Sequence, residues 1–223
     1  MKLSNRIEAL PYSAIRKLTP YADKAKKAGK KIYHLNIGAP DVKTPDLFLD
    51  AIKNLDLDVL TYAPSKGLPE LIEATSKYYK SWGMDFDPED IVVTTGGSEA
   101  LLFAILAITD EGDEVLTCEP FYANYNSFSY ETGIKMNSFS SSVQDGFHLP
   151  NKETIEKAIT PKTKAILLSN PCNPTGTVYN KEELRMVADI AKAHDLFILS
   201  DEVYREFTFD GAEFISFATF EDI

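Results

Sequence analysis

The sequence is poor in the residues that build disulfides and metal centres. Among its 223 residues there are 2 cysteines, Cys118 and Cys172, and 3 histidines. Their spacing matches no disulfide framework and no metal-ligand motif. We therefore expect a metal-free protein with reduced cysteines, as in the cytoplasm.

Basic side chains are also scarce. The chain has 23 Lys and Arg against 34 Asp and Glu, a formal net charge of −11. Because nucleic acids and anionic membrane surfaces bind clustered Lys and Arg, the sequence argues against both partners.

Long hydrophobic runs are missing as well. The longest, residues 100–108, is far short of the ~20 residues of a membrane helix. The first ten residues include Arg6 and Glu8 and lack the apolar core of a signal peptide. The sequence thus predicts a cytoplasmic protein without a membrane partner.

From residue 90 onward, short apolar runs alternate with amphipathic segments. The predicted strands are 91–95, 114–118, 134–139, 165–169 and 196–200. The predicted helices are 98–108, 122–132, a segment capped by Asn151, and 180–194. This alternation is typical of an α/β fold, a mostly parallel sheet with helices on both faces. The first 90 residues are expected to be mostly helical, with Pro45 just inside a helix.

Ligands of such sheets bind at the carboxyl ends of the strands, so the residues after each strand matter most. After the first predicted strand, the turn TTGGSEAL (94–101) places a glycine pair and Ser98 at a helix start, which favours a phosphate. The dinucleotide and P-loop fingerprints are absent. Gly96, Ser98 and Ala100 nearly match the G-x-S-x-G nucleophile elbow, with alanine in the last glycine position. A hydrolase that uses Ser98 as nucleophile and His194 as the triad histidine therefore stays open. So does the interpretation that the glycines only form a turn and bind no ligand.

Two further strand ends carry more specific patterns. The segment SNPCNPTGT (169–177) predicts a rigid turn, which would direct the Asn173 amide toward a ligand cleft at the strand ends. The alternative is a loop whose Asn, Pro and Gly residues only set its backbone shape. In LSDEVY (199–204), Asp201 ends a buried strand, where a carboxylate is costly without a partner. Asp201 and the Tyr204 hydroxyl are therefore candidate functional groups, with an N-cap as the alternative for Asp201.

Together these strand ends resemble the large domain of the class I/II pyridoxal-phosphate-dependent aminotransferases, enzymes of fold type I. The resemblance runs from about residue 30 to 210 and also includes NIGAPD (36–41) and YAPSKG (62–67). It implies the N-terminal portion of such an enzyme. Residues 1–45 would form an N-terminal arm and part of the small domain, and residues 46–223 an incomplete cofactor-binding large domain.

The resemblance also implies roles for individual residues toward pyridoxal 5'-phosphate (PLP). Asp201 matches the acid that keeps the pyridine nitrogen protonated, so that the ring acts as an electron sink. Tyr204 and Asn173 match the pair that hydrogen-bonds the 3-oxygen of the ring. The other implied cofactor contacts are Tyr122 on the ring face, the backbone donors of Gly97, Ser98 and Glu99 at the phosphate, and Tyr62.

Two implied roles reach beyond the cofactor. Gly38 and Asn173 match contacts to the substrate. Tyr62 matches a residue that reaches the phosphate of a neighbouring subunit, which implies a homodimer. Asp201 and Tyr204 are the expected catalytic residues.

The lysine that forms the Schiff base in this family is not recognisable. It normally follows the D-E-x-Y motif by some tens of residues, and no match occurs before Ile223. Lys66 lies in a loop elsewhere, and Lys162, Lys164 and Lys181 are expected to be solvated. We expect the chain alone to be inactive, and also unstable, because its predicted outer strands would lack partners.

The activity implied by the resemblance is amino-group transfer between an L-amino acid and a 2-oxo acid. A PLP-dependent β-eliminating lyase or a cyclopropane-carboxylate synthase-like enzyme shares the same cofactor contacts and stays open. So does a non-catalytic truncated relative. Aspartate or an aromatic amino acid is the first substrate to try.

Overall fold

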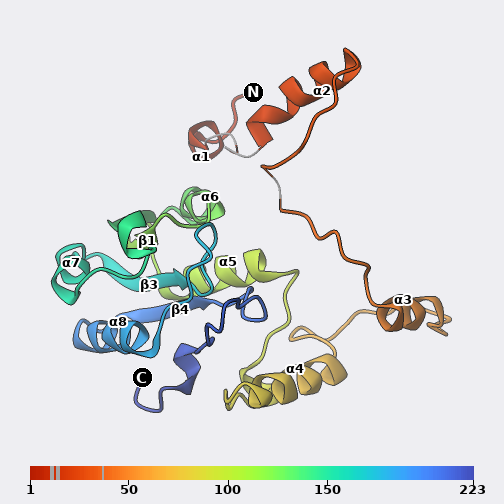
Figure 1. Ribbon diagram of the computed structural model, residues 1–223. Helices are drawn as coiled ribbons and strands as arrows, with labels where there is room; N and C mark the ends of the chain where they lie inside the picture. The colour runs from red at the N-terminus through yellow and green to blue at the C-terminus, as the bar shows by residue number, and fades with distance from the viewer. Residues whose placement is uncertain (11–12, 14–15, 37) are drawn as a thin grey trace. The chain divides into compact units, whose positions relative to one another are not determined.

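The computed structural model describes residues 1–10, 13, 16–36 and 38–223 and divides into two compact units (Figure 1). One unit comprises Met1–Pro11 and Lys66–Ile223, and the other comprises Tyr12–Ser65. The predicted domain boundary after residue 45 stays a prediction. Within the described ranges, no helix is both long enough and apolar enough to cross a membrane.

In the described part of the smaller unit, the α-helices are α2 (Thr19–Lys27) and α3 (Asp46–Lys53). A short 3-10 turn, Arg16–Leu18, precedes α2. The described residues of 28–45 and 54–65 form neither helix nor strand, so the first 90 residues are less helical than predicted. Pro45 takes the N-cap position of α3 rather than a place inside the helix.

The larger unit is built on a four-stranded sheet. Its strands are β1 (Glu114–Glu119), β2 (Lys135–Ser140), β3 (Thr163–Ser169) and β4 (Phe197–Asp201). They lie in the order β2-β1-β3-β4, and every neighbouring pair is parallel. The predicted α/β fold with a parallel sheet is confirmed.

Helices cover both faces of this sheet (Figure 1). Alternate residues of β3 point to opposite faces, as the pleat of a strand requires. Ala165 and Leu167 pack with α5 (Gly97–Ile108) and α6 (Asn124–Thr132). Ile166 and Leu168 pack with α7 (Lys152–Lys157) and α8 (Lys181–Ala193). The described residues of this unit also include the helices α1 (Asn5–Ala9) and α4 (Pro69–Ser81) and the short 3-10 turns Pro88–Asp90, Val143–Asp145 and Phe217–Thr219.

Local signals in the sequence account for several helix ends. The Asn180 side chain accepts a hydrogen bond from the Glu183 backbone N–H, and the Glu183 carboxylate accepts one from that of Asn180. This capping box starts α8 where predicted. Asn151 caps α7 with its side chain alone, which accepts a hydrogen bond from the Thr154 backbone N–H. Helix α6 ends at Gly133, whose φ of +81° suits glycine.

The predicted strand at 91–95 is wrong: this segment forms no ladder in the described chain. The Val93 backbone N–H donates to the Lys66 carbonyl at 2.8 Å instead. A β-branched run needs a neighbouring strand to become part of a sheet, and the four strands present do not supply one. Gly67 permits this close approach, because a Cβ there would lie 2.5 Å from Val93 Cγ2.

The outer strand β4 presents an open edge. It pairs with β3 on one side, and the side chain of Phe197 at its start is 58% exposed. Unpaired N–H and C=O groups beside an exposed aromatic ring favour association with other chains.

We therefore expect the 223-residue chain, expressed alone, to aggregate. Phe197→Lys should reduce that aggregation, because a charge on an edge strand opposes pairing. Val143→Lys, at an exposed apolar residue away from this edge, is the matched control. Size-exclusion chromatography and circular dichroism would test this. A soluble monomer of the unaltered chain with a cooperative melting transition would contradict the expectation.

Candidate active site

The ends of β3 and β4 lie side by side. The strand register places Ser169 opposite Asp201, and the Asn170 backbone N–H donates to the Asp201 carbonyl at 2.9 Å. The loop after β3 and the turn after β4 thus meet at one edge of the sheet. They bring Asn173 and Tyr204, which are 31 residues apart in the sequence, into contact.

Asp201 has a fixed partner on the α6 side of the sheet. Tyr125 Oη donates a 2.8 Å hydrogen bond to Asp201 Oδ2. The second oxygen, Oδ1, receives a long bond of 3.4 Å from the Val203 backbone N–H. Residues 203–206 form a turn rather than a helix. Asp201 therefore caps no helix, although this long bond joins its carboxylate to the first N–H of the turn that follows.

Asn173 and Tyr204 are brought together, as expected from the loop and turn that carry them. Asn173 Nδ2 donates to Tyr204 Oη at 3.3 Å. The loop around Asn173 is closed by backbone bonds from Cys172 to Thr177 (2.9 Å) and from Gly176 to Cys172 (2.8 Å). These bonds limit the positions that the Asn173 amide can take.

Asn170, the first asparagine of the same loop, has a structural role. Its Nδ2 donates to the Ile215 carbonyl at 3.2 Å, and its Oδ1 accepts from the Tyr179 N–H at 3.0 Å. Asn170 is buried, whereas Asn173 is half-buried. Of the two asparagines, Asn173 is therefore the one available to a ligand.

Tyr122 precedes α6 rather than lying inside it as predicted. Its ring meets the Tyr125 ring edge-on, with centroids 5.7 Å apart, and its hydroxyl accepts from Asn124 Nδ2 at 2.9 Å. Tyr122 is thereby linked through Tyr125 to Asp201.

The start of α5 has the geometry of an anion site. Gly96 has a φ of +78°, and Gly97 and Ser98 are exposed. The N–H groups of a first helical turn have no partner within the helix, so they suit a phosphate. Glu99 Oε2 accepts from the Thr95 N–H at 2.6 Å, which makes the backbone of Glu99, rather than its side chain, the group suited to a phosphate.

Helix α5 belongs to the same core cluster as the other groups. Leu101 and Leu102 pack there with Tyr122, Tyr125 and Leu199. The phosphate-type turn and the Asp201 strand end are therefore parts of one packed body.

Gly38 and Tyr62 belong to the other compact unit. Both are exposed, and among the residues that the structure describes, a Cβ at Gly38 would meet no atom within 4 Å. Their predicted roles remain predictions.

The candidate lysines and histidine lie in other settings. Lys66 Nζ donates to the Glu89 carbonyl at 2.8 Å. Lys162, Lys164 and Lys181 are exposed, as predicted. His194 follows α8 and lies 3.4 Å from Glu156 of α7, before β4 begins. Asp201 ends that strand, so nothing supports a hydrolase triad with His194.

These donors and acceptors fit a particular kind of ligand. A carboxylate, a neighbouring amide and phenol, and a helix N-terminus suit a ring with a basic nitrogen, a phenolic oxygen and a phosphate group. An aromatic residue at the same place suits the flat face of such a ring.

A family model described as aminotransferase class I and II matches residues 30–222. The chain belongs to this family. Class I and II aminotransferases use pyridoxal 5'-phosphate, whose nitrogen, phenolic oxygen and phosphate are the groups just described.

Curated relatives carry aminotransferase names. The chain is 35% identical over 228 residues to an aspartate aminotransferase of Geobacillus stearothermophilus, covering 98% of this chain and 56% of that protein. It is 36% identical over 214 residues to an aspartate/prephenate aminotransferase of Thermus thermophilus, covering 95% and 55%. The chain thus spans little more than half the length of these relatives.

Solved structures agree with this assignment. The aspartate aminotransferase of Thermus thermophilus with maleate superposes with a TM-score of 0.88 at 34% identity, covering 98% of this chain and 58% of that one. An alanine aminotransferase from Pyrococcus furiosus gives a TM-score of 0.89 at 34% identity, covering 98% and 56%. The fold of this chain is therefore that of the fold type I aminotransferases.

Sequence reasoning missed a second carboxylate beside the site, the buried Glu202. Glu202 points to the opposite face of β4 from Asp201. Its Oε1 accepts from Ser200 Oγ at 2.8 Å and Ser216 Oγ at 2.7 Å, and its Oε2 lies 3.6 Å from Arg205. The alternation of side chains along a strand could have predicted that Asp201 and Glu202 point to opposite faces. No sequence pattern, however, indicates that Ser216 would be a partner of Glu202.

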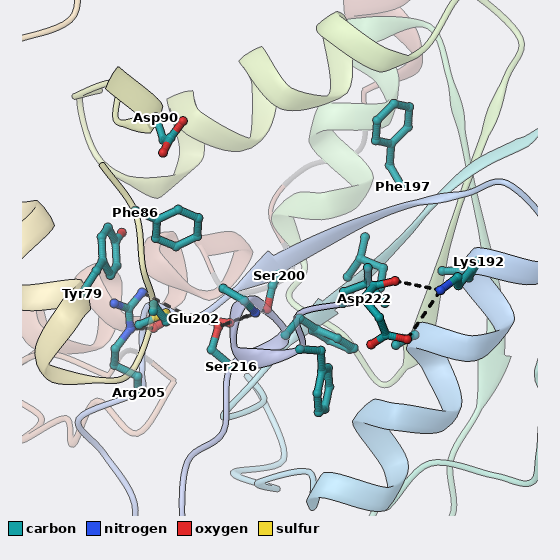
Figure 2. A pocket seen from close by; sticks show the side chains of 18 of the residues that line it. Tyr79, Phe86, Asp90, Lys192, Phe197, Ser200, Glu202, Arg205, Ser216 and Asp222 are labelled. Carbon is teal, nitrogen blue, oxygen red and sulfur yellow. Dashed lines mark hydrogen bonds and ion pairs between the residues drawn. The ribbon is translucent and has the colours of Figure 1, made fainter. Parts of the chain in front are cut away.

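Glu202 and its partners Ser200, Ser216 and Arg205 are among the residues that line a pocket of about 840 Å³ (Figure 2). The pocket is lined by residues of α8 and β4, by residues between 79 and 92, and by residues between 202 and 223. None of the predicted site residues is among them. The Arg205 guanidinium lies 4.9 Å from the centre of the Tyr79 ring of α4. Glu202 therefore connects the turn after Asp201 to Ser216 directly, and to α4 through Arg205.

Glu202 should make stability depend on pH. Burial raises the pKa of Glu202 above its ordinary value of 4.5. The folded state thus holds the proton more tightly than the unfolded chain, and stability falls as pH rises from 4.5 through the raised pKa. Glu202→Gln removes this titration, so its free energy of unfolding should decline less over that interval.

Urea denaturation of the full-length protein between about pH 4 and about pH 7 would measure the effect. Glu213→Gln, at an exposed carboxylate of the same segment, should follow the unaltered protein. Identical pH dependence of Glu202→Gln and the unaltered protein would contradict the prediction.

Proposed function

We propose that this chain is the cofactor-binding part of a PLP-dependent aminotransferase, which moves an amino group between an L-amino acid and a 2-oxo acid. The observation that carries the proposal is the junction of two strand ends. It places Asp201, held by Tyr125, next to the Asn173–Tyr204 pair. Family membership and the names of the relatives support the same function.

Bound PLP supplies an electron sink for the bonds to the substrate α-carbon. Asp201 would keep a proton on the ring nitrogen, since a carboxylate in a partly buried site stabilises the adjacent positive charge. Tyr204 and Asn173 would donate to the ring 3-oxygen. These three side chains set the charge distribution of the ring.

The remaining predicted residues would bind and orient. Tyr122 would cover one face of the ring and exclude water. The backbone N–H groups of Gly97, Ser98 and Glu99 would hold the phosphate at the positive end of α5. Gly38 and Asn173 would contact the substrate carboxylate.

The proton-shuttling lysine belongs to the proposal but is not among the residues that we assign. We propose that it lies outside these 223 residues, and that residues 46–223 are the large domain without it. On this view the 223-residue chain alone is inactive.

We also propose a cytoplasmic homodimer in which Tyr62 reaches the phosphate of the neighbouring site. The complete exposure of the Tyr62 side chain leaves it available for such a contact. The acidic composition and scarcity of cysteine support a cytoplasmic location.

The first experiment separates the possible reactions. The full-length protein is incubated with PLP, aspartate or an aromatic amino acid, and 2-oxoglutarate, and the products are identified. A new amino acid formed from the oxo acid supports the aminotransferase. Release of ammonia supports a β-eliminating lyase. A parallel incubation with an amino acid that carries a leaving group on its γ-carbon tests the third reaction: loss of that group, as a bond forms between the α- and γ-carbons, supports a cyclopropane-carboxylate synthase-like enzyme. No pyridoxyl adduct after borohydride reduction, seen by intact mass, would favour a non-catalytic relative.

Asp201→Asn should lower the transamination rate of the full-length protein by about a hundredfold or more, a loss typical of removing one preorganised electrostatic group. The neutral amide cannot stabilise the protonated ring nitrogen. Asp195→Asn is the matched control, because Asp195 is exposed and its φ of +54° is one that Asn readily adopts. Steady-state kinetics would measure both variants. Equal rates for Asp201→Asn and the control would refute the role of Asp201.

A further inference from the structure

Tyr125 is a core residue with a polar end at the candidate site. Its side chain is 0% exposed, and it packs between Phe121, whose ring is stacked 6.0 Å away, and Phe128 at 6.5 Å. A buried hydroxyl needs a partner, and that of Tyr125 has the carboxylate of Asp201 at 2.8 Å.

This hydrogen bond joins two elements far apart in the sequence. Tyr125 lies in the first turn of α6 and Asp201 ends β4, 76 residues later. The Tyr125 backbone N–H also donates to the Tyr122 carbonyl at 3.0 Å, and the two rings meet edge-on. One phenol therefore contacts both the residue proposed for the ring face and the residue proposed for the ring nitrogen.

The two carboxylate oxygens of Asp201 also have different partners. Oδ2 of Asp201 is occupied by Tyr125, while Oδ1 has the 3.4 Å bond from the Val203 N–H. Burial raises the pKa of Tyr125, so its hydroxyl stays protonated and acts as a donor across the physiological range.

We propose that Tyr125 is a positioning residue of the cofactor site, which holds Asp201 Oδ2 so that Oδ1 faces the pyridine nitrogen. The inference rests on the proposed function, and it assigns a role to a residue for which the sequence offered no indication. Tyr125 acts through Asp201 and not by touching the cofactor.

A double-mutant cycle on the apo form of the full-length protein tests this. The dissociation constant of PLP is measured by equilibrium dialysis for the unaltered protein, Tyr125→Phe, Asp201→Ala and the double variant. Tyr125→Phe should weaken PLP binding about tenfold, as expected for one lost hydrogen bond to a charged group. In the Asp201→Ala background the same change should alter binding by less than about twofold.

Tyr130→Phe is the matched control. Tyr130 lies in the same helix, and its ring is 38% exposed, so removal of its hydroxyl should leave PLP binding unchanged. Thermal melting followed by circular dichroism establishes that each variant is folded.

Each result decides a different point. An equal loss of affinity from Tyr125→Phe in both backgrounds, or no loss in either, overturns the positioning role while the proposed function stands. Failure of the unaltered protein to bind PLP overturns the proposed function and the inference together. The expected coupling between the two residues supports both.

A second measurement covers the case in which Tyr125→Phe does not fold. Site-specific 3-fluorotyrosine at position 125 keeps the ring in place and makes its hydroxyl a stronger donor. The ¹⁵N chemical shift of labelled PLP bound to the protein reports protonation of the ring nitrogen. A shift relative to the unaltered protein is expected, and an unchanged resonance overturns the proposal.

Discussion

The parallel pairing of β3 with β4 is the constraint on which the candidate site depends. Its register sets Ser169 opposite Asp201, and the ladder continues one step further through the bond from Asn170 to the Asp201 carbonyl. The two loops that follow the strands must then leave the sheet at the same edge. A shift of one residue would turn Asp201 to the opposite face, since side chains alternate along a strand.

The same alternation explains how two adjacent carboxylates take different roles. Asp201 points to the face covered by α5 and α6, where Tyr125 meets it. Glu202 points to the other face, where Ser200, Ser216 and Arg205 surround it. Burial of either carboxylate without partners would cost several kcal/mol. Partners on both faces therefore hold this strand end in place, and the half-buried Asp201 remains accessible to a ligand.

Helix α6 is equally important, because it brings aromatic residues to the carboxylate. Tyr122 lies just before α6 and Tyr125 in its first turn. Their rings are in contact, and the Tyr125 hydroxyl donates to Asp201. The core cluster beneath them also holds Leu101 and Leu102 of α5, the helix whose first turn suits a phosphate. The proposed contacts for the ring face, the ring nitrogen and the phosphate are therefore supported by one packed core.

The sequence alone determined the parallel α/β class and the starts of α7 and α8, because periodicity and capping are local patterns. Strand-end motifs also singled out Asp201, Asn173 and Tyr204, whose roles toward a cofactor stay predictions. The sequence predicted a strand at 91–95 that is not formed, since a β-branched run does not reveal whether a neighbouring strand is present to pair with it. Only the tertiary structure decided that Tyr125 holds Asp201 and that Ser216 and Arg205 hold Glu202. These partners join segments of the chain through packing of buried groups, and no local pattern records which distant residue will meet a buried carboxylate.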